Sequence, residues 1–304
     1  MFLARALASL SLIALPLQAV AAQTCRVTPA FTRADERGTK RVQVYQAAAE
    51  GTTGTALLFV SALKVNTDGT RISYHIDDPQ AQRLAINNIA NAMRRNVPDK
   101  VATFRRLAAA GFPAPATWQA LLPNVIEADR RTGKPCLDAD RYLVSKTSDV
   151  AIDGGHARDG DCTQAKWLDA LDVNALVLPS GRTEFSARGA DNRTPVVAMT
   201  LGTRRLAYGL VGDKGPTDEL GEASVAMNRT LNGLPPTERP ANYRDAVARF
   251  QAPRSVILLL PGSSNRVARP LSGATVTAAT RAQFERWGGQ ARLERCLTAI
   301  PEAR

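Results

Sequence analysis

The stretch LAYGLVGDKGPTDELGEASVAMNRTL, from Leu206 to Leu231, decides how the rest of the chain is interpreted. Leu206–Val211 is an apolar run with one aromatic residue, which is typical of a buried strand. The next five residues, Gly212 to Pro216, are dense in turn formers and predict that the strand ends there. Ala223–Leu231 has apolar residues at helical spacing and precedes an Asn-Gly pair, so we expect a short helix.

Two carboxylates lie at the ends of the predicted connecting loop. Asp213 follows the strand and Glu222 opens the helix. A strand end and a helix start can hold two acidic groups across one gap, which is the arrangement that acid/base catalysis requires. An aspartate in a glycine turn and a glutamate in a first helical turn are also ordinary structural features. On spacing alone, the structural interpretation is the stronger one.

The residues around this pair resemble a known family. The run from Tyr208 to Leu231 is similar to the strand–GD–loop–GEAS–helix segment of glycoside hydrolase family 75, the fungal-type chitosanases and their bacterial relatives. Further stretches fit the same family in the same order, together spanning about Lys64 to Asn265: VNTDGTRISYHIDDP, CLDADRYLVSKTSDV, VNALVLPSGR and SVILLLPGSSN. The resemblance implies an inverting endo-hydrolase of an amino-sugar polysaccharide, with Asp213 and Glu222 as its catalytic carboxyl pair.

The same resemblance places Asp68, in an Asp-Gly turn, in the sugar-binding region. A turn former is the alternative interpretation of Asp68. Tyr74 and Tyr208 are candidates for stacking on sugar rings, although core packing explains each of them as well. The sequence does not fix which catalytic carboxyl is the acid. The dipole of the predicted helix would lower the pKa of Glu222 and favour it as the base, with Asp213 as the acid, unless burial outweighs the dipole.

The charge of the chain bears on its substrate. The formal net charge is +11, whereas an enzyme for cationic chitosan should present an acidic cleft. A local acidic cleft around Asp213 and Glu222, with Asp68, Asp218 and Glu219, would resolve the conflict. A different amino-sugar polymer, such as the glycan of peptidoglycan, is the other solution. The rival function is a non-catalytic envelope protein that binds anionic polymer through an arginine-rich face. No basic run is interleaved with aromatics, so no nucleic-acid motif is recognised.

The N-terminus has the pattern of a secretory signal. A positively charged start precedes an apolar run over 6–17 and a small-residue site near Ala21 and Ala22. We therefore expect a signal peptide over 1–22, a single catalytic domain over 23–304, and a secreted or periplasmic monomer. The apolar run is too short to span a bilayer, which takes about 20 residues.

Four cysteines are present, at positions 25, 136, 162 and 296. Export favours two disulfides, with three pairings open. We favour Cys25–Cys296, which would tie the mature termini together, and Cys136–Cys162. No CxxC pair supports a zinc or redox site. The acidic loop Asp153–Asp161 departs from calcium-loop spacing and is interpreted as a solvated loop rather than a metal site. We expect no cofactor.

Apolar and alternating runs predict strands over 56–63, 71–76, 142–144, 173–179, 195–201 and 255–260. The runs 56–63 and 71–76 would form a hairpin with Asp68 near its tip. Helical spacing predicts a helical insertion over about 79–131. Its first helix would start at Pro79 with Asp77 or Asp78 as N-cap, its second at Pro98, and a short third would include Trp118. A C-terminal helix is predicted over 278–297 with a break at Gly288-Gly289, while 24–54 is polar and irregular. The fold class is α+β, with a mostly antiparallel, barrel-like β core. A likeness to double-psi barrels is an analogy only.

Overall fold

The computed structural model describes residues 25–50, 54–152 and 160–304, so the expected signal peptide and most of the acidic loop Asp153–Asp161 lie outside the described residues. The strands are β1 (Val27–Asp35), β2 (Lys40–Ala47), β3 (Ala56–Asn66), β4 (Ala175–Pro179), β5 (Pro195–Thr200), β6 (Leu206–Gly215), β7 (Glu222–Ser224) and β8 (Ala252–Leu259). The helices are α1 (Lys100–Ala109), α2 (Ala114–Ala120), α3 (Glu184–Ala187), α4 (Val225–Asn232), α5 (Tyr243–Asp245), α6 (Gly273–Trp287) and α7 (Gly289–Leu297).

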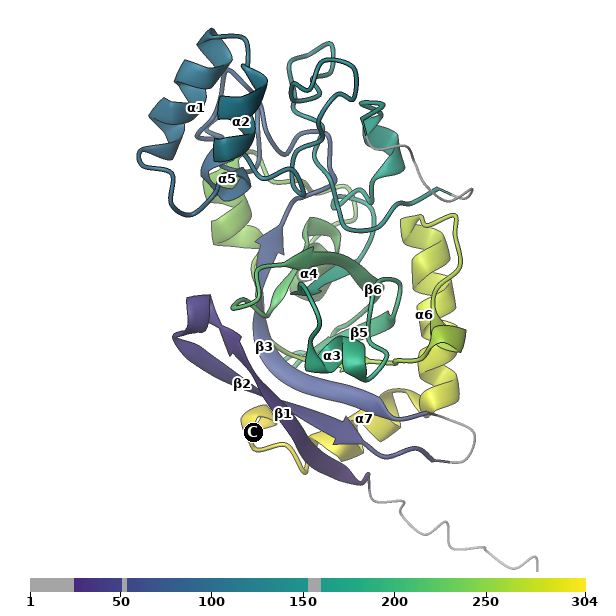
Figure 1. Ribbon diagram of the computed structural model, residues 1–304. Coiled ribbons are helices and arrows are strands. Elements are labelled where there is room, and N and C mark those ends of the chain that lie inside the picture. Colours follow the sequence, from purple (N-terminus) through teal and green to yellow (C-terminus); the bar gives the residue numbers. More distant parts are fainter. Residues whose placement is uncertain (1–24, 51–53, 153–159) are drawn as a thin grey trace, which may run out of the picture.

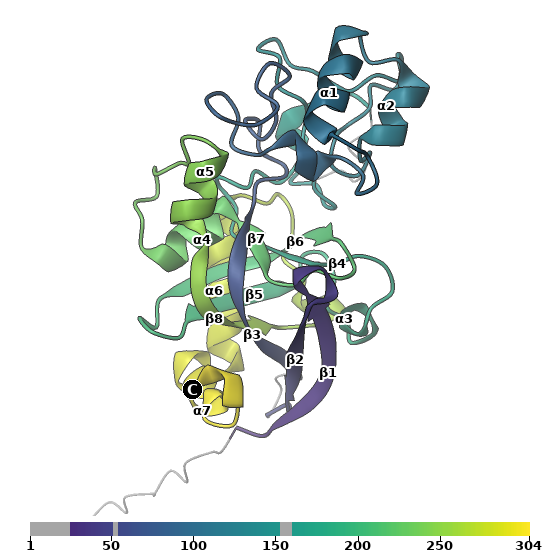
Figure 2. The same cartoon turned by 90° about the vertical axis from the view of Figure 1, so that its left-hand side faces the viewer.

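Six strands close into a barrel in the order β3-β7-β4-β6-β5-β8, with β8 returning to β3. The pairs β3–β7 and β4–β6 are parallel and the other barrel pairs are antiparallel. This confirms the predicted α+β fold with a mostly antiparallel, barrel-like core. The hairpin β1–β2 continues the sheet outward from β3, and α6 and α7 lie against the barrel (Figures 1 and 2).

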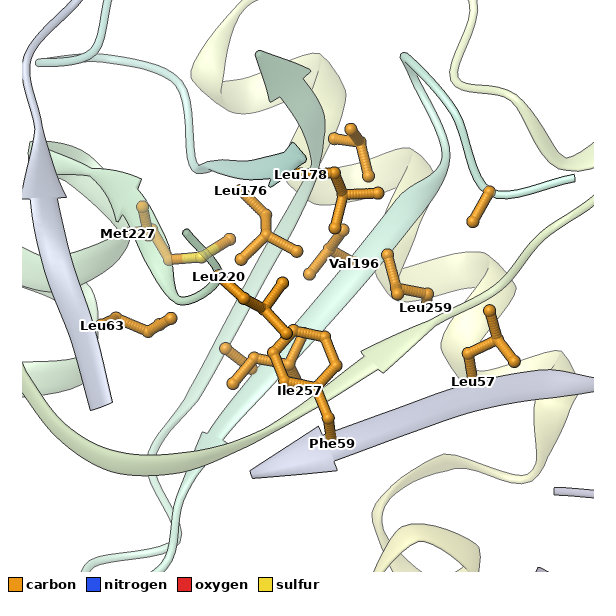
Figure 3. Packing of buried hydrophobic residues seen from close by; sticks show 14 of the residues in the cluster. Leu57, Phe59, Leu63, Leu176, Leu178, Val196, Leu220, Met227, Ile257 and Leu259 are labelled. Carbon is orange, nitrogen blue, oxygen red and sulfur yellow. The ribbon is translucent and has the colours of Figure 1, made fainter. Parts of the chain in front are cut away.

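The barrel interior is a closely packed apolar core (Figure 3). Residues from opposite sides of the barrel meet there, and all of them are at most 1% exposed: Leu57, Phe59, Leu63, Leu176, Val196, Met227, Ile257 and Leu259. Burying a side chain of this size stabilises the fold by roughly 1.5–3 kcal/mol. Because such a core has no room for polar groups, acidic side chains on these strands must point to the outer face.

A lobe formed by residues 67–174 is inserted between β3 and β4 and stands at one end of the barrel, with α1 and α2 at its far side (Figures 1 and 2). It has an apolar core of its own, which includes Tyr74, Phe104 and Leu143. The insertion predicted over 79–131 is therefore part of a longer one. Its helices α1 and α2 confirm two of the three predicted helical segments.

The helix predicted to start at Pro79 is wrong. The Asp78 carboxylate, expected to cap it, accepts hydrogen bonds from the backbone N–H groups of Gln82, Arg83, Leu84 and Ala85 at 2.7–3.3 Å. One carboxylate thus gathers four consecutive donors into a loop, and only a short 3₁₀ turn follows at Ile89–Ala92. Local side-chain hydrogen bonds have outcompeted the helix here.

The strands predicted at 71–76 and 142–144 are also wrong, since these segments form only isolated bridges such as His75–Tyr142. There is accordingly no hairpin around Asp68. The segment 24–54, predicted to be irregular, contains the β1–β2 hairpin. Its second strand places Val42 and Val44 against the barrel core, a contact that is visible only once the core is assembled.

Both favoured disulfides are present. Cys25 bonds to Cys296 with Cα atoms 4.9 Å apart, and Cys136 bonds to Cys162 at 5.2 Å. The first joins the segment before β1 to α7, and the second lies within the lobe. Among the described residues, no helix combines the length and apolarity needed to cross a membrane.

Candidate active site

Asp213 owes its orientation to a bulge in β6. Val211 is paired with Leu176 and points into the barrel core, while Asp213 is paired with Val177. Gly212 is the extra residue between them. In a regular strand without this bulge, residues 211 and 213 would share a face, and Asp213 would point with Val211 into the core. The strand predicted to stop at Gly212 instead runs on to Gly215, because the neighbouring strand β4 supplies partners on both sides of the bulge.

Glu222 lies in the short strand β7, not at the start of a helix, so that part of the prediction is wrong. β7 fits between β3 and β4, and Glu222 is paired with Lys64 and with Val177. Helix α4 starts only at Val225, with Ser224 as its N-cap. The strand form is favoured because β7 then pairs with β3 on one side and with β4 on the other, and so closes the gap between these two strands.

Asp213 and Glu222 therefore flank the same residue of β4, Val177, and share its outer face. Two interstrand spacings put their Cα atoms about 10 Å apart. The side chain of Glu222 extends from β7 across β4 towards β6. A Cβ placed on Gly215 of β6 would lie 3.5 Å from Glu222 Oε2.

Asp68 joins this pair from the end of β3. Its backbone N–H donates to Asn66 Oδ1 at 2.9 Å, which bends the chain just after the strand. Its Oδ1 accepts from the Tyr74 hydroxyl at 2.8 Å and from Ser145 Oγ at 3.4 Å. Asp68 is thus held by the lobe and faces the barrel.

A small pocket separates Asp68 from Asp213. Its volume is about 10 Å³, about the space of one water molecule. The barrel and the lobe both contribute to its walls, which are formed by Asn66, Asp68, Thr147, Leu168, Asp169, Ala170, Val173, Ala175, Val177, Gly212, Asp213 and Ser224. The site is therefore built where the inserted lobe meets the outer face of the barrel.

Burial raises the pKa of all three carboxyl groups. It is the main cause of the rise for Asp68, to about 8, with further repulsion from Asp213 and Glu222. It raises the pKa of Glu222 to about 7, helped by the negative charge of Glu219 and opposed by Lys64. It raises the pKa of Asp213 only to about 6, because hydrogen bonds from the backbone N–H groups of Lys214 and Ser148 favour the ionised form. Near neutral pH the site holds both an ionised and a protonated carboxyl group.

The surrounding acidic residues are paired with bases. Asp218 accepts a two-pronged pair of hydrogen bonds from Arg95 at 2.7 and 2.8 Å, and Glu219 pairs with Lys64 at 3.1 Å. Among the described residues, Asp68, Asp213 and Glu222 form no ion pair within 4 Å. Within the acidic cluster expected from the sequence, Arg95 lowers the pKa of Asp218, whereas the pKa values of Asp68, Asp213 and Glu222 are raised.

The two candidate tyrosines lie in different places. Tyr74 is 1% exposed, and its hydroxyl contacts Asp68, so it is brought to the site by its polar end. Tyr208 packs against Phe284 and beneath the guanidinium of Arg281, both on α6. The structure brings Tyr74 to the carboxyl groups and leaves Tyr208 on the α6 side of the barrel.

Several groups at the site carried no recognisable signal in the sequence. The backbone N–H of Ser148 donates to Asp213 Oδ1 at 2.7 Å, and Asn87 Nδ2 donates to the Tyr74 hydroxyl at 2.8 Å. A backbone donor has no residue signature, and Asn87 lies in a segment that was interpreted as helix. These contacts are made by tertiary structure alone.

Gly221, directly before Glu222, adopts a φ of +90°. A Cβ there would lie 2.3 Å from Ser61 Oγ and 2.8 Å from the carbonyl oxygen of Ala62. We expect Gly221→Ala to destabilise the protein by about 2–3 kcal/mol through backbone strain and overpacking against β3. Urea unfolding measures the loss. Gly202→Ala, at a glycine with ordinary φ and open space around it, is the control; an equal loss there would contradict the explanation.

Within residues 25–50, 54–152 and 160–304, no group of three or more His, Cys, Asp and Glu side chains is arranged to hold a metal ion. The three carboxyl groups are near enough to affect one another's pKa but do not converge on a common point. Comparison with protein-family models and with curated proteins found no match.

Proposed function

We propose that this protein hydrolyses the glycosidic bonds of an amino-sugar polysaccharide, with Asp213 and Glu222 as the carboxyl pair. The observation that carries the proposal is the environment of these two side chains. They flank Val177 of β4 on the outer face of the barrel, their pKa values are raised, and neither forms an ion pair with a described residue. Asp213 is 9% exposed and Glu222 is half-buried, and carboxylates withdrawn from water in this way are normally paired with a base when their role is structural. Groups with such perturbed pKa values gather at functional sites.

The pKa values favour Asp213 as the base and Glu222 as the acid, opposite to the assignment from the helix dipole. Asp213 Oδ1 is held by backbone donors, so Oδ2 is left to accept a proton from water. In the proposed reaction the water oxygen bonds to the anomeric carbon, its proton passes to Asp213, and the leaving oxygen takes the proton of Glu222. Solvent then restores both protonation states. A water between base and sugar fits an inverting geometry, with carboxyl groups roughly 6.5–9.5 Å apart.

The proposed substrate class is chitosan-like. Among the described residues, the ionised Asp213 has no ion-pair partner, so a glucosamine ammonium group near it would supply the missing positive charge. The rival proposal, a non-catalytic protein that binds anionic polymer, would favour carboxylates neutralised by arginine. The two disulfides and the signal-like N-terminus support export in either case.

The direct test compares product release from chitosan oligosaccharides and from peptidoglycan by the wild type and by Glu222→Gln. We expect turnover of chitosan oligosaccharides, lowered by about 10²–10³ in the variant because the leaving group loses its proton donor. Reducing-end chromatography quantifies the products. Equal turnover by the two proteins would remove Glu222 from the mechanism, and salt-sensitive binding without turnover would favour the rival.

The proposed roles also predict a narrow pH optimum. Asp213 must be ionised, so activity falls as pH drops below about 6. Glu222 must be protonated, so activity also falls as pH rises above about 7. We expect kcat/KM to peak between these values and to fall about tenfold per pH unit on each side. In Glu222→Gln, the fall in activity that starts above about pH 7 should disappear, while the fall below about pH 6 should remain. Circular dichroism across the range separates catalysis from unfolding, and a broad plateau from pH 4 to 9 would contradict both assignments.

A further inference from the structure

Asp68 and Asp213 are held in matching ways across the small pocket. In each carboxyl group, Oδ1 accepts the direct hydrogen bonds: from Tyr74 and Ser145 in Asp68, and from the backbone N–H groups of Ser148 and Lys214 in Asp213. Among the described residues, no hydrogen bond of normal geometry is made to either Oδ2 atom, although the side chain of Ser148 is close enough to Asp213 to lower its pKa. The pocket that both residues line has room for about one water molecule. The second oxygen of each group is therefore the one left for that water.

The donors around Asp68 fix where its proton is carried. Asn87 Nδ2 donates to the Tyr74 hydroxyl oxygen at 2.8 Å, and Asn91 Nδ2 in turn donates to Asn87 Oδ1 at 2.7 Å. The Tyr74 hydroxyl is thus free to donate its hydrogen to Asp68 Oδ1. Ser145 Oγ, which accepts from the Gly69 N–H at 3.1 Å, is likewise left to donate to Oδ1. With two donors aimed at Oδ1, the proton of a neutral Asp68 belongs on Oδ2.

We propose that Asp68 acts as a neutral carboxylic acid, whose Oδ2–H donates a hydrogen bond to the water that Asp213 activates. This role rests on the proposed hydrolase function. The water would receive one hydrogen bond from Asp68 and donate one to Asp213, which leaves a lone pair for attack on the anomeric carbon. Asp68 transfers no proton in the reaction and positions the nucleophile. Its pKa of about 8, raised by burial and by Asp213 and Glu222, keeps it protonated at neutral pH.

Two substitutions at one position test this role. Asparagine reproduces the neutral acid, with its oxygen towards Tyr74 and its NH₂ group towards the water, so we expect Asp68→Asn to keep kcat within about fivefold of the wild type. Alanine removes the donor, so we expect Asp68→Ala to lower kcat about 100-fold with KM changed less than about threefold. Asp99→Asn, at the exposed N-cap of α1 where asparagine caps equally well, is the matched control and should leave kcat unchanged.

The pH profile provides a readout that a purely structural role would not move. The titratable groups facing Asp68 are Asp213 and Glu222 from the barrel, Tyr74 from the lobe, and Asp169 on the pocket wall. On the barrel side, Lys64 acts on Glu222 and Lys214 acts on Asp213. In the wild type, kcat should fall about tenfold per pH unit above the pKa of Glu222 and about a hundredfold per pH unit above about pH 8, because Asp68 then also ionises. In Asp68→Asn the fall should stay about tenfold per pH unit.

The outcomes separate this inference from the function on which it rests. If the wild type turns over and Asp68→Asn is as inactive as Asp68→Ala, Asp68 works in its ionised form and the inference is overturned. If Asp68→Ala is fully active, Asp68 has no part in the reaction. If the wild type has no turnover at all, the proposed function fails, and the role of Asp68 in catalysis fails with it. A crystal structure then still tests the geometry: an ordered water within about 3.2 Å of both Oδ2 atoms supports the inferred hydrogen-bond arrangement, and its absence overturns that arrangement.

Discussion

Replacing Asp213 with asparagine is expected to lower kcat by about 10³–10⁴, the largest catalytic loss of any single substitution. The amide keeps the size of the side chain and accepts the backbone hydrogen bonds of Ser148 and Lys214 at 2.7 and 2.8 Å. It has no oxygen basic enough to take a proton from water. The measurement is single-turnover product formation from a chitosan oligosaccharide.

The same variant should be more stable than the wild type. The pKa of Asp213 rises from its usual 3.8 to about 6 on folding, which means that ionising this group costs the folded state stability. The cost is absent below about pH 3.8, grows between about pH 4 and 6, and is complete above pH 6, where it amounts to at most about 3 kcal/mol. Asparagine carries no charge and removes the cost.

We therefore expect Asp213→Asn to raise the midpoint of thermal unfolding by several degrees at pH 7, and to have little effect at pH 4. The Asp99→Asn variant is again the control for an exposed carboxyl-to-amide change. A variant that is both inactive and less stable at pH 7 would mean that Asp213 is a structural carboxylate, and the proposed role would have to be abandoned.

Breaking the disulfide between Cys25 and Cys296 should cause the largest loss of stability. The bond closes a loop with a sequence separation of 271 residues, and the chain-entropy model assigns such a cross-link about 5 kcal/mol. Its two half-cystines also pack in the cluster that joins α7 to the β1–β2 hairpin, with Tyr45, Trp287 and Leu297. The Cys25→Ser/Cys296→Ser double variant isolates this contribution, which urea unfolding measures.

The matched control is Cys136→Ser/Cys162→Ser, whose cross-link spans 26 residues and is worth about 3 kcal/mol in the same model. We expect the first pair to lose more stability, with urea m-values that rise in both variants because the denatured state without the cross-link exposes more surface. The reverse order would show that local packing in the lobe, not loop closure, governs the contribution of these bonds.

Much of the barrel was predictable because its signals are local. The apolar runs of β3, β5 and β8 and the helical spacing of α6 and α7 are each contained in one short segment, and all appear where the pattern places them, within a few residues. Asp213 and Glu222 are candidates because the residues around them resemble a known family, since their spacing alone favours a structural interpretation. The β1–β2 hairpin escaped prediction because its apolar side chains, such as Val42 and Val44, pack on a core to which residues far along the chain, such as Leu259, contribute.

The sequence by itself determined which residue types are available and where the strongest strands and helices lie. Tertiary structure alone decided what the carboxyl groups can do. The bulge at Gly212 depends on pairing with β4. The strand conformation of Glu222 depends on the gap between β3 and β4. The hydrogen bond that orients Asp68 comes from Tyr74 of the inserted lobe. The physical reason is that secondary structure is favoured by neighbours along the chain, whereas a pKa is set by burial and by charges and donors brought near in space.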